Sequence, residues 1–223
     1  MITLTGLDVT SSRTSEAPAA TPIVFVADAD ISVRESLERL IEASGWQAET
    51  FASAGEFLAY PRTSVPSCLV LDVTLPDLDG LALQRRVAAD RPDVPVIFFA
   101  GHADIVTSVA AMKAGALEFL TKPCSREVLL VAIRHALDHS RRTLERDAMM
   151  KTLRENYASL TRREREVMTL VASGLLNKQV GGELGISEIT VKAHRGQVMR
   201  KMHADSLPAL VTMVSRLGGY RPS

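Results

Sequence analysis

Five short segments with strand character, each followed by a segment expected to be helical, constrain the fold of this chain more than any other feature. Four are mainly apolar, at residues 23–27, 68–71, 96–99 and 117–120, and the fifth, QAETF at residues 47–51, is mixed. After the first segment the apolar residues recur every three or four positions, as they do on the inner face of a helix, and a helix is expected after each of the others. Strands of continuous apolar character that alternate with helices form a parallel sheet covered on both faces. The sequence therefore predicts an α/β domain with a five-stranded, doubly wound sheet over residues 23–140.

The C-terminal part of the chain, residues 157–223, has no strand pattern. The sequence TRRE at residues 161–164 is a capping box that predicts the start of a helix. The turn GIS follows at residues 185–187, and Ser187 is a suitable N-cap for the helix after it. A helix, a turn that contains glycine and a second helix form the helix-turn-helix motif. We predict an all-α domain of four helices.

The two predicted domains are joined by a segment without Pro or Gly, from Arg126 to Asn156. It predicts one long helix, of which residues 141–156 form a linker. Leucines recur in it every seven residues, which leaves open a coiled-coil dimer seam, but Lys151 occupies the next heptad position. Residues 1–22 are poor in large apolar side chains, so we predict a disordered tail there.

The charge of the chain is balanced as a whole but divided between its parts. Residues 1–160 hold 16 Lys and Arg against 21 Asp and Glu, a net of −5. Residues 161–223 hold 10 against 5, a net of +5. A small basic module often binds nucleic acid, although a merely solvated charged surface remains the alternative on charge alone.

Composition excludes several other classes of protein. Hydrophobic residues make 46% of the chain and charged residues 23%, which is typical of a soluble globular protein. No apolar run approaches the ~18 residues of a membrane span, and the N-terminus lacks the apolar core of a secretory signal. Cys68 and Cys124 cannot build a disulfide framework or a four-ligand zinc site. We expect a cytoplasmic protein without a membrane partner, in which Cys124 packs as a small thiol rather than senses redox state.

Charged side chains follow three of the predicted strands. Asp28 and Asp30 come after the first strand, Asp72 ends the third, and Lys122 follows the fifth. The carboxyl ends of parallel strands meet at one edge of a sheet, where ligands bind. Clustered carboxylates can hold Mg²⁺, and a carboxylate can attack phosphorus. The alternative is that these acids only form turns.

Longer motifs give a resemblance to a known family. Residues 23–140 resemble the receiver domain of two-component response regulators, through LVLDVTLPDLDG around Asp72 and AMKAGALEFLTKP around Lys122. Residues 157–220 resemble a LuxR-type DNA-binding domain, through LTRREREVMTLVASGLLNKQV and LGISEITVKAHRGQVMRKM. The chain is thus similar to the FixJ/NarL class of response regulators, which implies a flavodoxin-like receiver.

The resemblance implies roles for single residues of the receiver. Asp72 would be the phosphoacceptor, and Asp28, Asp72 and the main-chain carbonyl of Thr74 would hold Mg²⁺. Lys122 would contact the phosphoryl group, and its bond to the following proline is usually cis in the family. Phe119 occupies the position of the aromatic switch residue.

Two positions of the acceptor pocket depart from the family pattern. Ala29 stands where the family has a second acid that binds the metal directly, and alternation along the backbone directs the adjacent Asp30 elsewhere. Ala100 stands where the family has a Thr or Ser that donates a hydrogen bond to the phosphoryl oxygen. We expect weak Mg²⁺ binding and a weakened phosphorylation switch.

The third helix of the C-terminal domain is the expected DNA-reading element. Ile189, Val198, Met199 and Met202 are expected to pack inward. The resemblance places Lys192, Ala193 and Gly196 against the bases, and Ala193 can meet only a thymine methyl. The remaining expected DNA contacts, including phosphate contacts, are Lys178, Ser187, Thr190, His194, Arg195, Arg200 and Lys201. The pair Gly181-Gly182 inside the second helix has no explanation in the sequence.

These observations predict a transcription factor and not an enzyme. Its partners would be double-stranded promoter DNA, a histidine kinase and a second copy of the chain, at least on DNA. A phosphorylation-independent regulator, controlled by abundance or by a protein partner, is the alternative. A phosphatase of the haloacid-dehalogenase type would need a second acid two residues after Asp72, where this chain has Thr74.

Overall fold

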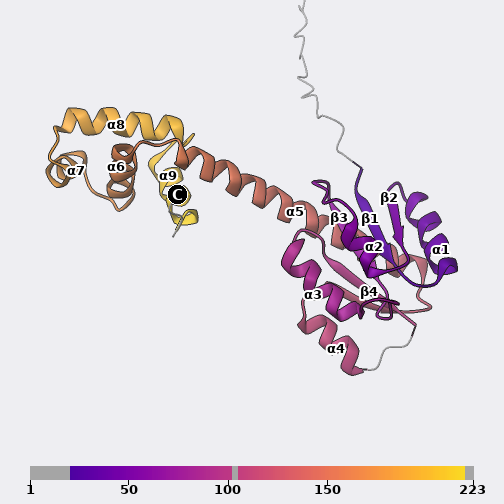
Figure 1. Cartoon of the computed structure of the whole chain (residues 1–223). Helices are drawn as coiled ribbons and strands as arrows, with labels where there is room; N and C mark the ends of the chain where they lie inside the picture. The colour runs from indigo at the N-terminus through magenta and orange to yellow at the C-terminus, as the bar shows by residue number, and fades with distance from the viewer. Residues whose placement is uncertain (1–20, 102–104, 219–223) are drawn as a thin grey trace, which may run out of the picture. The chain divides into compact units, whose positions relative to one another are not determined.

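The computed structural model describes residues 21–101 and 105–218 (Figure 1). Residues 1–20 of the predicted tail lie outside the described part. The chain divides into two compact units, residues 1–141 and 142–223. Helix α5, Arg126–Ala158, contributes residues to both units. No helix of residues 21–101 and 105–218 is both long enough and apolar enough to span a bilayer.

The first unit is built on five parallel strands in the order β2-β1-β3-β4-β5. The strands are β1 (Ile23–Ala27), β2 (Gln47–Phe51), β3 (Ser67–Leu71), β4 (Val96–Ala100) and β5 (Glu118–Thr121). The helices between them are α1 (Ile31–Glu42), α2 (Ala54–Ala59), α3 (Gly80–Asp90) and α4 (Ile105–Lys113). The predicted doubly wound fold is confirmed.

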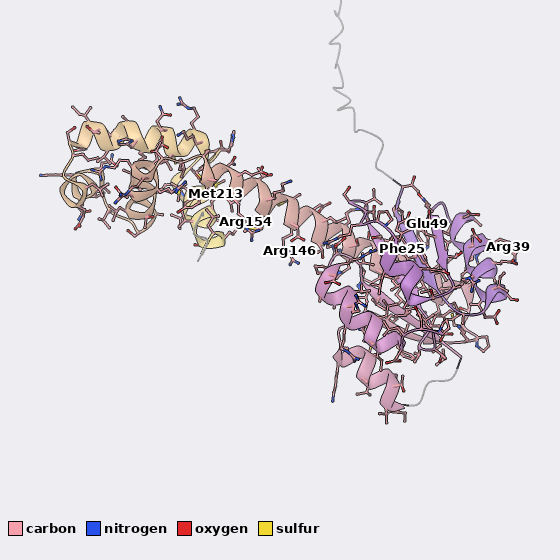
Figure 2. The ribbon with its side chains drawn as sticks, viewed as in Figure 1. Phe25, Arg39, Glu49, Arg146, Arg154 and Met213 are labelled. Atoms are coloured by element: carbon pink, nitrogen blue, oxygen red, sulfur yellow. The ribbon has the colours of Figure 1, made fainter. Side chains whose placement is uncertain are left out.

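Both faces of this sheet are covered, and each face has its own core. Phe25 of β1 packs with residues of α2, α3 and α4, whereas its neighbours Val24 and Val26 pack with α1 and the first half of α5. In Figure 2 the labelled Phe25 lies inside the unit and Arg39 of α1 lies at its surface. Alternation along a strand thus fills the two cores from the same five residues.

Leu137, one of the leucines that recur every seven residues in α5, does not lie in a free seam. It is 3% exposed because it packs in the core between α5 and the sheet. A side chain that completes a domain's own core is not free to pack against a second chain.

The second unit is helical, as predicted. Its helices after α5 are α6 (Arg162–Ala172), α7 (Asn177–Leu184), α8 (Glu188–Lys201) and α9 (Leu207–Arg216). Thr161 forms the predicted capping box with Glu164, and the Ser187 hydroxyl accepts the Thr190 amide at the start of α8. Gly185 ends α7 with a φ of 64°, a conformation that glycine adopts without strain.

The prediction for one inward position on α8 is wrong. Ile189 is 80% exposed, and Val191 fills the interior position instead. Val198 and Met202 are buried as expected, and Met199 is partly buried.

The structure explains one residue of the Gly181-Gly182 pair. A Cβ atom on Gly181 would lie 2.7 Å from the carbonyl oxygen of Ile186, whereas one on Gly182 would meet nothing within 4 Å. The turn between α7 and α8 therefore packs directly against the backbone of Gly181.

This difference predicts opposite effects of two adjacent substitutions. Gly182→Ala should raise the free energy of unfolding by about 0.5–1 kcal/mol, since alanine favours a helix over glycine by that amount. Gly181→Ala should not raise the free energy of unfolding, because overpacking typically costs about 1–3 kcal/mol and offsets the helix preference of alanine. Urea unfolding of both full-length variants, followed by circular dichroism, measures the difference. Equal stabilisation by the two substitutions would contradict the close packing at Gly181.

Candidate functional site

The carboxyl edge of the sheet brings together two acids and one lysine. The Lys122 Nζ atom lies 2.5 Å from Asp28 Oδ2 and 3.0 Å from Asp72 Oδ2. The side chain of Asp28 is 3% exposed, that of Asp72 is 17% exposed and that of Lys122 is 18% exposed. The three charges therefore interact with little screening by water.

Main-chain hydrogen bonds at the carboxyl ends of the strands hold Asp72 and Lys122 in place. The Asp72 amide donates to the Ala27 carbonyl at 2.9 Å, and the Lys122 amide donates to the Ala100 carbonyl at 2.8 Å. The peptide bond between Lys122 and Pro123 is cis.

The two carboxylates hold Lys122 in its charged form. Burial alone would lower the pKa of Lys122, but hydrogen bonds to Asp28 and Asp72 outweigh it and raise the pKa above the ordinary lysine value. The amine is thus a fixed cation beside Asp72, suited to balance a negative group at that carboxylate.

Asp30 has a different task. Its Oδ1 atom accepts the Ser32 amide at 2.8 Å, so it caps the N-terminus of α1. Its own amide donates to Asp28 Oδ1 at 2.9 Å. Ala29, between the two acids, is exposed and contributes no ligand.

Sequence reasoning missed Arg34 at this edge. One guanidinium nitrogen of Arg34 donates to the carbonyls of Asp28 and Ala29, at 2.7 and 3.0 Å. Arg34 thereby fixes the backbone between β1 and α1. The signal that could have found it is a cation in the first turns of the helix that follows Asp28.

The acidic edge offers a small set of ligands for a divalent cation. In the described part of the chain no three His, Cys, Asp or Glu side chains form a metal-binding group. The acids at the edge that contact Lys122 are Asp28 and Asp72. Mg²⁺ binds through one or two carboxylates and keeps several waters, so this pair fits a hydrated ion. The pair must share its charge with Lys122.

The end of β4 lacks a polar side chain. Ala100 is 1% exposed and offers only a methyl group. On the neighbouring strand, Phe119 is partly buried and its ring stacks on Phe98, with centroids 5.6 Å apart and planes at 23°. The aromatic side chain is therefore engaged with the core.

The loop after Asp72 is held by two contacts that sequence reasoning did not predict. A Cβ on Gly80 would lie 2.6 Å from the Asp72 carbonyl oxygen, so only glycine permits this approach of α3. The Asp77 carboxylate accepts the amides of Gly55 and Ala54, at 2.8 and 2.9 Å, and these bonds lower the pKa of Asp77. The signal for both is the turn sequence PDLDG.

The second candidate site is the outward face of α8. Lys192, Ala193, Gly196 and Arg200 are all exposed, as the DNA-contact prediction requires. Lys178, on α7, is also exposed. The Ser187 hydroxyl lies 2.8 Å from the Thr190 hydroxyl, so both are occupied at the start of the helix.

Several basic side chains of α8 already have partners within the unit. Lys201 Nζ contacts Glu164 Oε2 at 2.7 Å and the Ser159 carbonyl at 3.3 Å, so it braces the start of α6. Arg195 donates to Asn177 Oδ1 at 3.3 Å. His194 is only partly exposed. Further partners are Glu188 for Lys192, at 3.3 Å, and Gln197 for Arg200.

Glu164 is the acid that fixes Lys201. Burial would raise its pKa, but hydrogen bonds from Lys201 and from Thr161 outweigh burial and lower the pKa below the ordinary value. Lys201 is therefore paired with Glu164 within its own unit, and 30% of its side chain stays exposed.

Comparisons with known proteins match both units. Residues 24–134 match the family model described as response regulator receiver domain. Residues 158–214 match the model described as bacterial regulatory proteins, luxR family.

Full-length relatives give the same assignment. Nodulation protein W of Bradyrhizobium diazoefficiens is 46% identical over 88% of this chain and 86% of its own length. The transcriptional regulatory protein FixJ of the same organism is 37% identical over 87% of this chain and 95% of its own. The low-resolution structure of the response regulator StyR, at 43% identity, gives a TM-score of 0.80 over 88% of this chain and 100% of that one. The chain therefore belongs to the response regulators that join a receiver domain to a luxR-family DNA-binding domain and regulate transcription.

Proposed function

We propose that this protein binds promoter DNA through α8, and that phosphorylation of Asp72 changes this binding only weakly. The proposed domains are the receiver at residues 23–140, the helical linker at 141–156 and the DNA-binding domain at 157–223. The observation that carries the weak coupling is Ala100, a buried methyl at the end of β4, the strand next to β3.

In this proposal Asp72 accepts a phosphoryl group from a histidine kinase, and Lys122 contacts the added oxygens. The position of Lys122 Nζ, 3.0 Å from Asp72 Oδ2, supports that role. Receiver domains generally use Mg²⁺, and here Asp28, Asp72 and the Thr74 carbonyl would hold it. When bound, the ion supplies positive charge for the transferred group.

The weak coupling follows from what the pocket cannot do after phosphorylation. A switch moves only when the added group interacts differently with the two states of the protein. Ala100 has no donor with which to follow the phosphoryl group, and the Phe119 ring is stacked on Phe98. The lack of a side-chain donor at Ala100 also favours the second candidate function. This is a regulator that acts without phosphorylation and responds to abundance or to a protein partner.

The ligand set predicts weak Mg²⁺ binding that one substitution improves. Ala29→Asp should lower the Kd for Mg²⁺, because it adds a carboxylate next to Asp28 where the pocket now has none. Titration of Mg²⁺ by calorimetry measures the change, with Asp30→Ala as the matched control. Equal affinity in the wild type and in Ala29→Asp would contradict this ligand assignment.

The DNA-binding proposal rests on the exposed face of α8. A helix of this kind enters the major groove, where Lys192 and Ala193 would meet base edges. Lys178 and Arg195 would hold phosphates, which position the protein without reading sequence. Lys201, with its bonds to Glu164, would reach DNA only after leaving them.

A dimer on DNA would reveal itself in the spacing of protected bases. Two helix-turn-helix units related by two-fold symmetry need half-sites about one helical turn, ~10 base pairs, apart. We expect footprinting to show two such protected half-sites. A single isolated half-site at every protein concentration would reject the homodimer.

A further inference from the structure

The exposed side chain of Ile189 is unusual for a residue of its size. It lies in the first turn of α8 and is 80% exposed, although burial of an isoleucine is worth about 1.5–3 kcal/mol. The core of α6, α7 and α8 is completed without it, because Val191 fills the interior position. Ile189 therefore has no partner within the described part of its unit that would hide its apolar surface.

Helical spacing places Ile189 on the same face as the proposed base-reading residues. Positions 189, 192, 193 and 196 are related by three, four and seven residues, so they share one side of the helix. All four residues are exposed. Val198 lies nine residues from Ile189, about half a turn away in projection, and it is fully packed in the core.

The chemistry of this face is partly apolar. Lys192 contributes one amine, and Gly196 contributes no side chain and has open space where a Cβ would lie. Ile189 and Ala193 are four residues apart and together present adjacent apolar groups. The apolar feature of the major groove is the C5 methyl of thymine.

We infer that Ile189 is a specificity-determining residue that packs on the C5 methyl of a thymine beside the base pair read by Lys192. The N-terminal residues of a recognition helix are the ones that reach base edges, and Ile189 is the second residue of α8. The inference rests on the proposed docking of α8 in the major groove.

The experiment removes the thymine C5 methyl and the Ile189 side chain separately. The preferred DNA site is first selected from a random library with the full-length protein. Each thymine of the site is then replaced by deoxyuridine, which lacks only the C5 methyl, and Kd is measured for the wild type and for Ile189→Ala. Val211→Ala, which changes another exposed aliphatic residue, on α9, is the matched control.

We expect one thymine per half-site whose replacement weakens wild-type binding about fourfold, the change that ~0.8 kcal/mol per buried methyl group produces. Ile189→Ala should be insensitive to that replacement, while Val211→Ala should keep the sensitivity of the wild type. If Ile189→Ala keeps the same thymine dependence, or weakens binding equally at all sequences, the assignment of Ile189 is wrong although α8 still binds DNA. If no DNA site is selected at all, the proposed docking of α8 fails and the inference fails with it.

Discussion

Lys192→Ala should weaken binding to the preferred DNA site by about fivefold to 150-fold, since a base contact of this kind is worth ~1–3 kcal/mol. Lys192 is 63% exposed and its partner in the free protein is Glu188, one helical turn away. Such an exposed pair contributes little to folding, so the effect should appear in DNA binding and not in stability. Lys192→Ala should also relax the base preference at one position of each half-site.

Lys178→Ala is the control that distinguishes recognition of a base from contact with a phosphate. Removal of a phosphate-binding amine at Lys178 should weaken binding about equally for all sequences and reduce the salt dependence of binding. Gel-shift titrations against the selected site and against single-base variants distinguish the two patterns. If both substitutions weaken all sequences equally, Lys192 does not read a base.

Restoring the two missing groups of the acceptor pocket should create a strong response to phosphorylation. The double variant Ala29→Asp/Ala100→Thr regains a metal ligand and a hydroxyl that can bond to the phosphoryl group. One hydrogen bond to a charged group is worth about 1.5–3 kcal/mol, so DNA binding should rise about tenfold on treatment with acetyl phosphate.

Two control measurements test whether the response of the double variant comes from phosphorylated Asp72 in a folded protein. Ala100 is buried, so thermal unfolding must show that threonine is accommodated there. Adding Asp72→Asn to the double variant should abolish the response to acetyl phosphate. A response that survives Asp72→Asn would place the phosphoryl group elsewhere.

The fold is predictable because the three central strands, β1, β3 and β4, are short, mainly apolar runs between polar turns, whereas the edge strands β2 and β5 also carry polar residues. The strands expected at residues 23–27 and 47–51 have the bounds that the structure shows, and the other three differ by a residue at one or both ends. The convergence of Asp28, Asp72 and Lys122 also follows from topology alone, since parallel strands end at one edge.

The sequence prediction does not identify which face of α8 is turned toward the core, although the spacing of its apolar residues determines that face. Ile189 and Val191 are two residues, about 200°, apart on a helix, so only one of them can face the core. Val191, Val198 and Met202 lie seven and four residues apart and form one inward face. Ile189 lies nine residues before Val198, about half a turn away in projection, so it faces outward when Val198 faces the core.

Contacts between distant segments leave no local signal. Lys201 meets Glu164 across 37 residues of sequence, so a basic side chain that the sequence assigns to DNA is also paired within its own unit. The close approach of Gly181 to Ile186 depends on the geometry of the turn, which the glycine pair alone does not reveal.

Weak coupling of Asp72 to DNA binding is tested by a gel-shift titration of the wild type and of Asp72→Asn, each with and without acetyl phosphate. We predict that all four Kd values for the preferred site agree within about threefold, below ~0.7 kcal/mol in binding free energy. A tenfold gain in affinity that needs the phosphodonor, and that the wild type shows and Asp72→Asn lacks, would contradict weak coupling.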